Sequence, residues 1–138
     1  MSTAAVNRAV ARAERVLPGS PALPGKRDPR WQAIIRIGAF VETHPEEVWQ
    51  FVQRWGKHAQ LDIRAAVATC LLEHLLQAHF ERIFPRVRSA AFESARFART
   101  FQMCWQFGQA EEPANHARIK RLQSQLRRTP KPPPRRAS

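Results

Sequence analysis

One segment, residues 61–76 with the sequence LDIRAAVATCLLEHLL, restricts the possible folds more than any other part of the chain. After Asp62 and Arg64 the segment is almost wholly apolar, and its leucines extend the apolar surface nearly all the way around a helix. Such a surface must be covered by neighbouring elements on several sides, because its exposure to water is unfavourable. The segment therefore predicts a central helix from about Leu61 to His79 that is packed between other helices.

The segments on either side of this helix also show the helical period. Before it, four apolar residues recur at positions i, i+3, i+4 and i+7 and share one face: Val48, Phe51, Val52 and Trp55. Pro45 suits the first turn of this helix and Gly56 suits its end, which predicts a helix over residues 45–56. Similar patterns predict helices at residues 31–43, 85–107 and 113–128, with a boundary at Pro85. No stretch shows the alternation typical of a strand, so the sequence predicts an all-α fold with about five helices.

The basic side chains are concentrated at the two ends of the chain. The net charge is +12, yet residues 31–116 contain nine basic and nine acidic side chains and are neutral as a whole. The ends are rich in proline and basic residues, and neither can bury enough apolar surface to offset the entropy of ordering it. We therefore expect a flexible N-terminal extension over residues 1–30, one helical domain over 31–128, and a flexible basic tail over 129–138.

Residue types that carry catalysis are present, but their spacing does not match a known site. Cys70 and His74 lie at i and i+4, where both could face one metal ion, yet their spacing to Cys104 matches no zinc signature. Neither cysteine has an activating base in its sequence neighbourhood, and the five glycines are too dispersed to form a phosphate-binding loop. The sequence thus predicts no catalytic, cofactor or metal site. It predicts instead a cytoplasmic protein with reduced thiols that is not an enzyme.

The segments PEEVWQFVQRWG and LDIRAAVATCLLEHLL, joined by a short polar turn, resemble a HEAT-type helical repeat. In such repeats an acid near the turn and an arginine at the start of the second helix typically link one repeat to the next through hydrogen bonds. The resemblance implies that Asp62 and Arg64 are repeat-stacking residues. It also implies that the helices form short antiparallel hairpins, stacked side by side as an α-solenoid.

Helical-repeat proteins of this general shape include DNA alkylation repair glycosylases, which hold DNA in a basic, aromatic-lined concave groove. By analogy alone, the groove and its acid would be formed by Trp49, Arg54, Trp55, Lys57 and Asp62. The neutral charge of the middle of the chain and its short length argue against this activity.

Two non-enzymatic functions remain. A solenoid offers a large, shape-specific surface, which favours an interaction module that binds a protein or peptide partner. The alternative is a nucleic-acid-associated protein whose basic C-terminal helix and tail bind the phosphate backbone. Its possible contacts are the eight cations that follow residue 116 without an intervening acid: Arg118, Lys120, Arg121, Arg127, Arg128, Lys131, Arg135 and Arg136. No run approaches the roughly 20 apolar residues of a membrane-spanning helix, so we expect no membrane partner.

Overall fold

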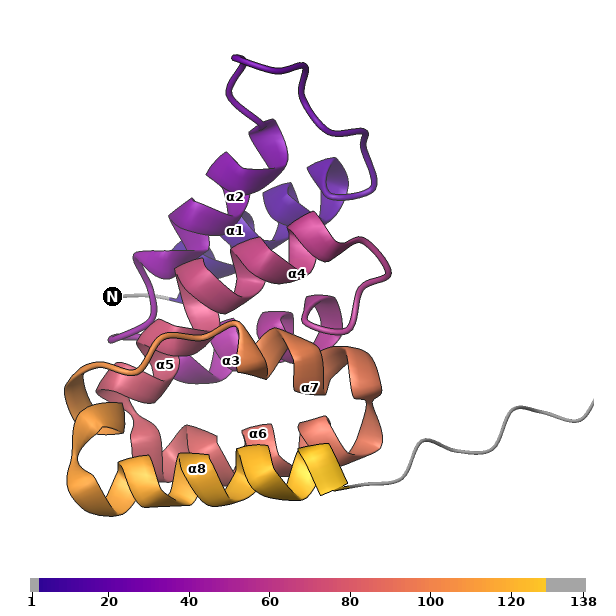
Figure 1. Cartoon of the computed structure of the whole chain (residues 1–138). Coiled ribbons are helices and arrows are strands. Elements are labelled where there is room, and N and C mark those ends of the chain that lie inside the picture. Colours follow the sequence, from indigo (N-terminus) through magenta and orange to yellow (C-terminus); the bar gives the residue numbers. More distant parts are fainter. Residues whose placement is uncertain (1–2, 129–138) are drawn as a thin grey trace, which may run out of the picture.

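The computed structural model describes residues 3–128, and within this range the chain is helical and contains no strand (Figure 1). The helices are α1 (Thr3–Val16), α2 (Pro29–Gly38), α3 (Pro45–Trp55), α4 (Leu61–Val67), α5 (Glu73–Ala78), α6 (Phe80–Glu93), α7 (Ala95–Gln102) and α8 (Pro113–Arg128). A π-helical segment, Ala68–Leu72, joins α4 to α5 without interruption, and a short 3-10 helix, Gly108–Glu111, precedes α8. The all-α prediction is confirmed for the described residues. They form seven separate α-helical bodies, however, and not about five.

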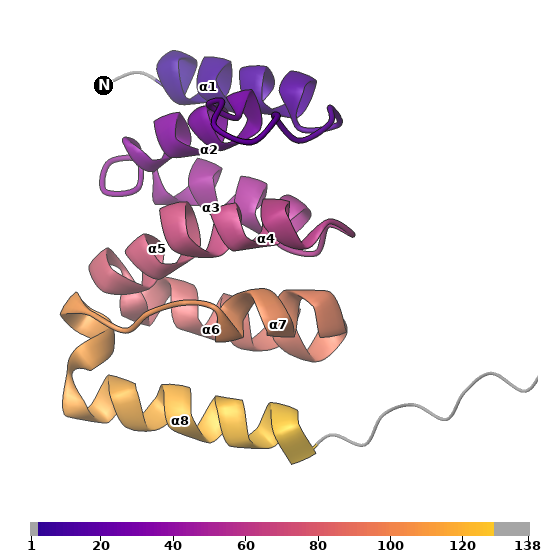
Figure 2. The same cartoon turned by 45° about the horizontal axis from the view of Figure 1, so that its top comes forward.

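The helices are arranged in two layers. Helices α1, α3, α6 and α8 form the first layer, and α2, the continuous α4–α5 helix and α7 form the second. Each second-layer helix packs against the first-layer helix that precedes it in the chain, and it also packs against its neighbours within its own layer. Figure 2 shows that the helices follow one another along the stack in chain order. The result is a row of antiparallel helical pairs that ends with α8.

The predicted central helix lies where the sequence placed it, from Leu61 to Ala78. Leu61 at its start is exposed, but five of its apolar residues are fully buried in the middle of one continuous core: Ile63, Val67, Leu71, Leu72 and Leu75. Helices from both layers cover it, because α2, α3 and α7 contact α4 and the π-helical segment, and α6 contacts α5. Neighbouring helices therefore cover the near-continuous apolar surface of this helix, as its sequence predicted.

A buried arginine joins the first two helices of the second layer. Arg30, in the first turn of α2, is only 1% exposed. Its guanidinium donates to Asp28 through Nε and Nη2, to the Gln60 side chain at 2.8 Å through Nη1, and to Asp62 through Nη2. Asp28 also caps α2, since its Oδ1 accepts the backbone N–H of Arg30 at 2.9 Å. One cation is thus paired with two carboxylates across the contact between α2 and α4.

Ion pairs also connect successive helices of the first layer. Three acids each meet an arginine of the next first-layer helix: Glu14 with Arg54 at 2.9 Å, Glu46 with Arg86 at 2.6 Å, and Glu81 with Arg118 at 2.9 Å. The partners are 40, 40 and 37 residues apart, so the same contact recurs at nearly constant intervals. These pairs are partly exposed and contribute modestly to stability. Together they connect all four helices of the first layer in chain order.

The single helix predicted over residues 85–107 is wrong. Helix α6 begins before Pro85 and continues through it to Glu93, and α7 starts anew at Ala95. Between them Ser94 has an extended backbone, and its Oγ accepts the N–H of Phe97 at 3.2 Å as the cap of α7. Proline is tolerated inside α6 because Pro85 is exposed, so the carbonyl group that lacks an amide donor can be solvated.

The flexible extension predicted over residues 1–30 is wrong for residues 3–16. Helix α1 packs against α2, and Val6, Ala13 and Leu17 are fully buried. Although the residues after α1 are rich in proline, its alanines and valines pack closely enough on α2 to offset the entropy of ordering. The predicted tail, 129–138, lies outside the described residues.

Replacing Arg30 with methionine tests the joint between α2 and α4. The change leaves two carboxylates without their shared cation, so we expect the free energy of unfolding to fall by about 2 kcal/mol. The control is Arg36→Met, on the same helix but exposed, for which the change should stay within about 0.5 kcal/mol. Urea denaturation of both variants measures the difference, and equal stability of the two would contradict the proposed role of Arg30.

The same joint predicts a dependence of stability on pH. The hydrogen bonds from Arg30 lower the pKa of Asp28 in the folded chain below the unfolded value of about 3.9. The stability that comes from ionised Asp28 is therefore present above that value and is lost as the pH falls through the lower, folded-state pKa. Asp28→Asn should make the stability loss between about pH 6 and pH 3 smaller than in the wild type. An unchanged loss, measured by urea denaturation at both pH values, would show that Asp28 is not the group responsible.

Candidate functional site

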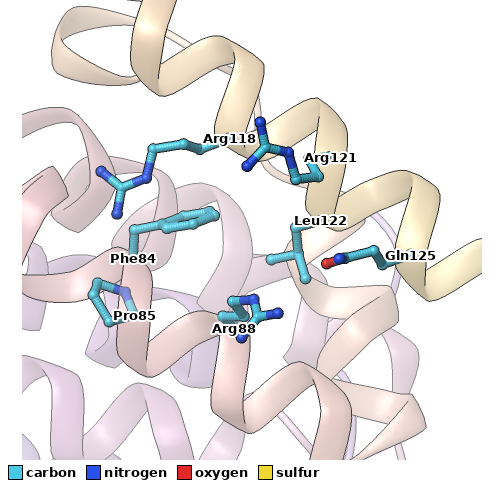
Figure 3. A pocket seen from close by; sticks show the side chains of 7 residues that line it. All are labelled: Phe84, Pro85, Arg88, Arg118, Arg121, Leu122 and Gln125. Atoms are coloured by element: carbon cyan, nitrogen blue, oxygen red, sulfur yellow. The ribbon is translucent and has the colours of Figure 1, made fainter.

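A groove lined by three arginines lies between α6 and α8, near the C-terminal end of the stack. Its volume is about 360 Å³. Helix α6 supplies Phe84, Pro85 and Arg88, and α8 supplies Arg118, Arg121, Leu122 and Gln125 (Figure 3). Three arginines thus line one cavity, and none of the lining residues is acidic.

Apolar contacts of α8 place its arginines over this groove. Ile119 and Leu122 are buried and attach α8 to the core. Arg118 and Arg121 lie three residues apart, so they occupy the same side of the helix. In Figure 3 both side chains extend from α8 above the groove, and Arg88 approaches from α6. The core residues of an otherwise polar helix therefore determine where its cations lie.

Arg118 is held in a defined position by three contacts. Its Nη1 donates to Glu81 at 2.9 Å. Its guanidinium also lies over the rings of Phe80 and Phe84, 5.3 and 5.0 Å from their centroids, which is a cation–π arrangement. Arg118 is therefore both oriented and partly neutralised.

Arg88 and Arg121 have no such compensation. Both are exposed, and neither has a carboxylate within ion-pair distance among residues 3–128. Arg88 lies 5.2 Å from the centroid of the Phe92 ring, which supports the side chain without neutralising it. The groove therefore has an excess of positive charge at its surface and is chemically suited to an anion.

The structure distributes the predicted nucleic-acid contacts over three locations. Arg118 and Arg121 line the groove, while Lys120, Arg127 and Arg128 lie on the exposed surface of the same helix. Lys131, Arg135 and Arg136 lie outside the described residues. The sequence did not indicate Arg88, which belongs to a stretch of balanced charge 30 residues before Arg118. Only the packing of α8 on α6 brings these arginines together.

A second cationic surface lies at the opposite end of the stack, between α1 and α2. Two adjoining cavities of about 210 and 420 Å³ share Arg12, Ala33 and Arg36 in their walls, and they also include Arg8 and Arg27. None of these four arginines forms an ion pair with a described residue. Both ends of the stack therefore present arginines without neighbouring carboxylates.

The predicted stacking residues lie at contacts between second-layer helices. Asp62 accepts a hydrogen bond from Arg30 of α2. Arg64 is 6% exposed, and its Nη1 donates to the backbone carbonyl of Arg96, in the first turn of α7, over a long distance of 3.4 Å. The two residues thus face opposite neighbours, and the contact of Asp62 is much the stronger.

The thiols and the aromatic residues considered for catalysis are poorly placed for it. Burial raises the pKa of the Cys104 thiol well above its usual value, and burial also raises the pKa of Cys70, so neither is a thiolate near neutral pH. Trp49 is buried edge-to-face against Phe97 rather than lining a groove. Within residues 3–128 no three His, Cys, Asp or Glu side chains gather to hold a metal ion.

The fold and the site together define an all-helical two-layer stack with arginine-lined grooves at both ends. In the described part of the chain, no helix is both long and apolar enough to cross a membrane. Residues 20–126 match the model of a family of unknown function (DUF6869), and the chain belongs to that family. The match spans α2 to α7 and most of α8 but leaves out α1. Neither the curated proteins nor the solved structures contain a match.

Proposed function

We propose that this protein is a non-enzymatic helical-repeat module of the HEAT type that binds a nucleic acid through its phosphate backbone. The observation that carries the proposal is the groove between α6 and α8, where Arg88, Arg118 and Arg121 meet and only Arg118 has a carboxylate partner. Arginine suits this role because its planar guanidinium stays charged and binds phosphate oxygens in pairs.

The recurrence of contacts along the stack supports the repeat-module part of the proposal. First-layer ion pairs recur at separations of 37 to 40 residues. In the second layer Arg30 reaches Asp62 and Arg64 reaches the Arg96 carbonyl, each 32 residues further along the chain. A HEAT-type repeat links successive repeats through an acid and an arginine, and the contacts of Asp62 and Arg64 with neighbouring second-layer helices support this interpretation.

The distribution of the cations supports an extended anionic partner over a small one. Beyond the groove, Lys120, Arg127 and Arg128 continue the positive surface along the exposed side of α8, which contains no acid. Residues 120 and 127 are seven apart and so repeat about 10 Å along the helix. One strand of a nucleic acid presents a phosphate about every 3.4 Å along its axis, so it can contact cations spread over this length, and such contacts release condensed counterions.

A glycosylase receives no support from the residues that the sequence analogy assigned to it. Trp49 is buried, Arg54 pairs with Glu14, and Asp62 is engaged by Arg30. These side chains do not converge on one cavity among those that line the described surface. The proposal therefore remains non-enzymatic.

One observation favours a protein or peptide partner as the second candidate. Trp105, between α7 and α8, is 77% exposed, although its backbone N–H is anchored to the buried Glu73 side chain at 2.9 Å. An exposed tryptophan on an anchored backbone is typical of the few residues that dominate protein interfaces. It lies outside the arginine-lined groove.

Removing the two unpaired groove arginines tests nucleic-acid binding. We expect the full-length Arg88→Ala/Arg121→Ala variant to bind a fluorescent single strand or duplex more weakly. The slope of log K against log salt should decrease in magnitude by about 2, because two phosphate contacts are lost. Fluorescence anisotropy at several KCl concentrations measures both quantities.

The matched control is Arg54→Ala/Arg82→Ala, which removes the same charge from arginines that already have carboxylate partners. Its affinity and salt slope should stay close to those of the wild type. Equal losses in both variants would show that net charge and not the groove determines binding. Equally tight binding of polyglutamate would instead favour an acidic protein partner, and no salt-dependent binding of any nucleic acid would refute the proposal.

A further inference from the structure

Arg64 differs sharply from Arg30, although both are buried arginines at the start of second-layer helices. Arg30 has three polar partner side chains, two of them carboxylates. Among residues 3–128, Arg64 has a single hydrogen bond, of 3.4 Å to the Arg96 carbonyl, and its buried Nε has no partner. A buried guanidinium with unmade hydrogen bonds is unfavourable, because the water it loses is not replaced.

The charged groups nearest to Arg64 increase this cost. Arg96 and Arg99 of α7 are exposed cations, and neither they nor Arg64 form an ion pair with any residue between 3 and 128. Burial first, and then repulsion by Arg99 and Arg96, lower the pKa of Arg64. Three guanidinium groups thus share one region without a counter-charge from the described chain.

This arrangement costs stability that a purely structural side chain would not need to cost. A side chain that only filled space between α4 and α7 would be more stable as an apolar residue of similar length, because a buried ion rarely repays its loss of hydration even when it is paired. The second buried donor without a partner among the described residues, Trp55 Nε1, belongs to α3, which forms a hairpin with α4. Both buried side-chain donors that lack a partner among the described residues therefore belong to this hairpin.

We infer that Arg64, Arg96 and Arg99 form an oxyanion site at the contact between α4 and α7, which takes a phosphate group. The buried Arg64 supplies a hydrogen-bond donor, and Arg96 and Arg99 supply positive charge on the exposed surface of α7. This site is distinct from the groove between α6 and α8 and does not depend on it. The phosphate comes either from a nucleic-acid backbone or from a free phosphate, since both present the same tetrahedral oxygens.

Thermal unfolding of the full-length protein with inorganic phosphate, at constant ionic strength set by chloride, tests this inference. The Tm of the wild type should rise saturably, by about 4 °C at ten times the dissociation constant. In the Arg88→Ala/Arg121→Ala background, which lacks the two unpaired arginines of the groove, the added Arg64→Met change should not lower the stability without phosphate. It should weaken the response of the Tm to phosphate at least tenfold. A second variant, Arg96→Ala/Arg99→Ala, alters only exposed residues and should weaken the response at least tenfold.

Controls separate this site from a structural joint and from the proposed groove. Arg54→Met, at an exposed and paired arginine, and Arg88→Ala/Arg121→Ala should both keep the phosphate response of the wild type. A wild type without any response, or an Arg64→Met variant that keeps it, would overturn the inference. Destabilisation of Arg64→Met comparable to that of Arg30→Met would overturn it too, because Arg64 would then be a stabilising joint.

A comparison of an oligonucleotide with inorganic phosphate identifies the source of the phosphate group. The groove variant Arg88→Ala/Arg121→Ala is compared with the same variant that also carries Arg64→Met. An oligonucleotide that raises the Tm of the first but not of the second, at a far lower phosphate concentration than the inorganic ion, assigns the site to a nucleic acid. Equal potency per phosphate assigns it to the free ion. The Arg88→Ala/Arg121→Ala variant retains Arg64, Arg96 and Arg99. A negative result for the Arg64 site therefore does not affect the salt-dependence test of the groove.

Discussion

The pairing of Arg30 with Asp28 and Asp62 is the constraint on which the rest of the arrangement depends. A fully buried guanidinium is tolerated only where its charge and its hydrogen bonds are met, and α2 and α4 must lie side by side for this to happen. Their contact fixes how the first two helices of the second layer lie against each other. The central helix then has its apolar surface covered by both layers, and the later helices follow in the same order.

Ion pairs between neighbouring helices also explain why the surface charge is uneven. Within the first layer, Glu14, Glu46 and Glu81 each form an ion pair with an arginine of the next first-layer helix. Other cations at the two ends have no acid within ion-pair distance among residues 3–128: Arg8, Arg12, Arg36, Lys120, Arg127 and Arg128. A stack with a neutral middle therefore has cationic ends, and these ends are the surfaces that support the proposed binding of phosphate.

Much of the fold could be predicted from local patterns. The helix over residues 61–78 follows from its near-continuous apolar surface, and α3 and α8 follow from clear periods with proline near their first turns. The division at Ser94 could not be predicted in this way, because Ser94 lies at a position that also continues the apolar face. Helix α1 was missed for a related reason: its burial depends on α2, which no pattern within residues 3–16 reveals.

The candidate site was predictable only in part. The run of cations in α8 is visible in the sequence, and so is the acid–arginine pair at Asp62 and Arg64. The sequence by itself determined the helical class and the location of the central helix, because both follow from the spacing of apolar residues along the chain. Only the tertiary structure decided that Arg88 joins Arg121, and that Arg30 is compensated while Arg64 is not. Charge compensation is a property of distances in space, and residues 30 or more positions apart acquire those distances only when the helices pack.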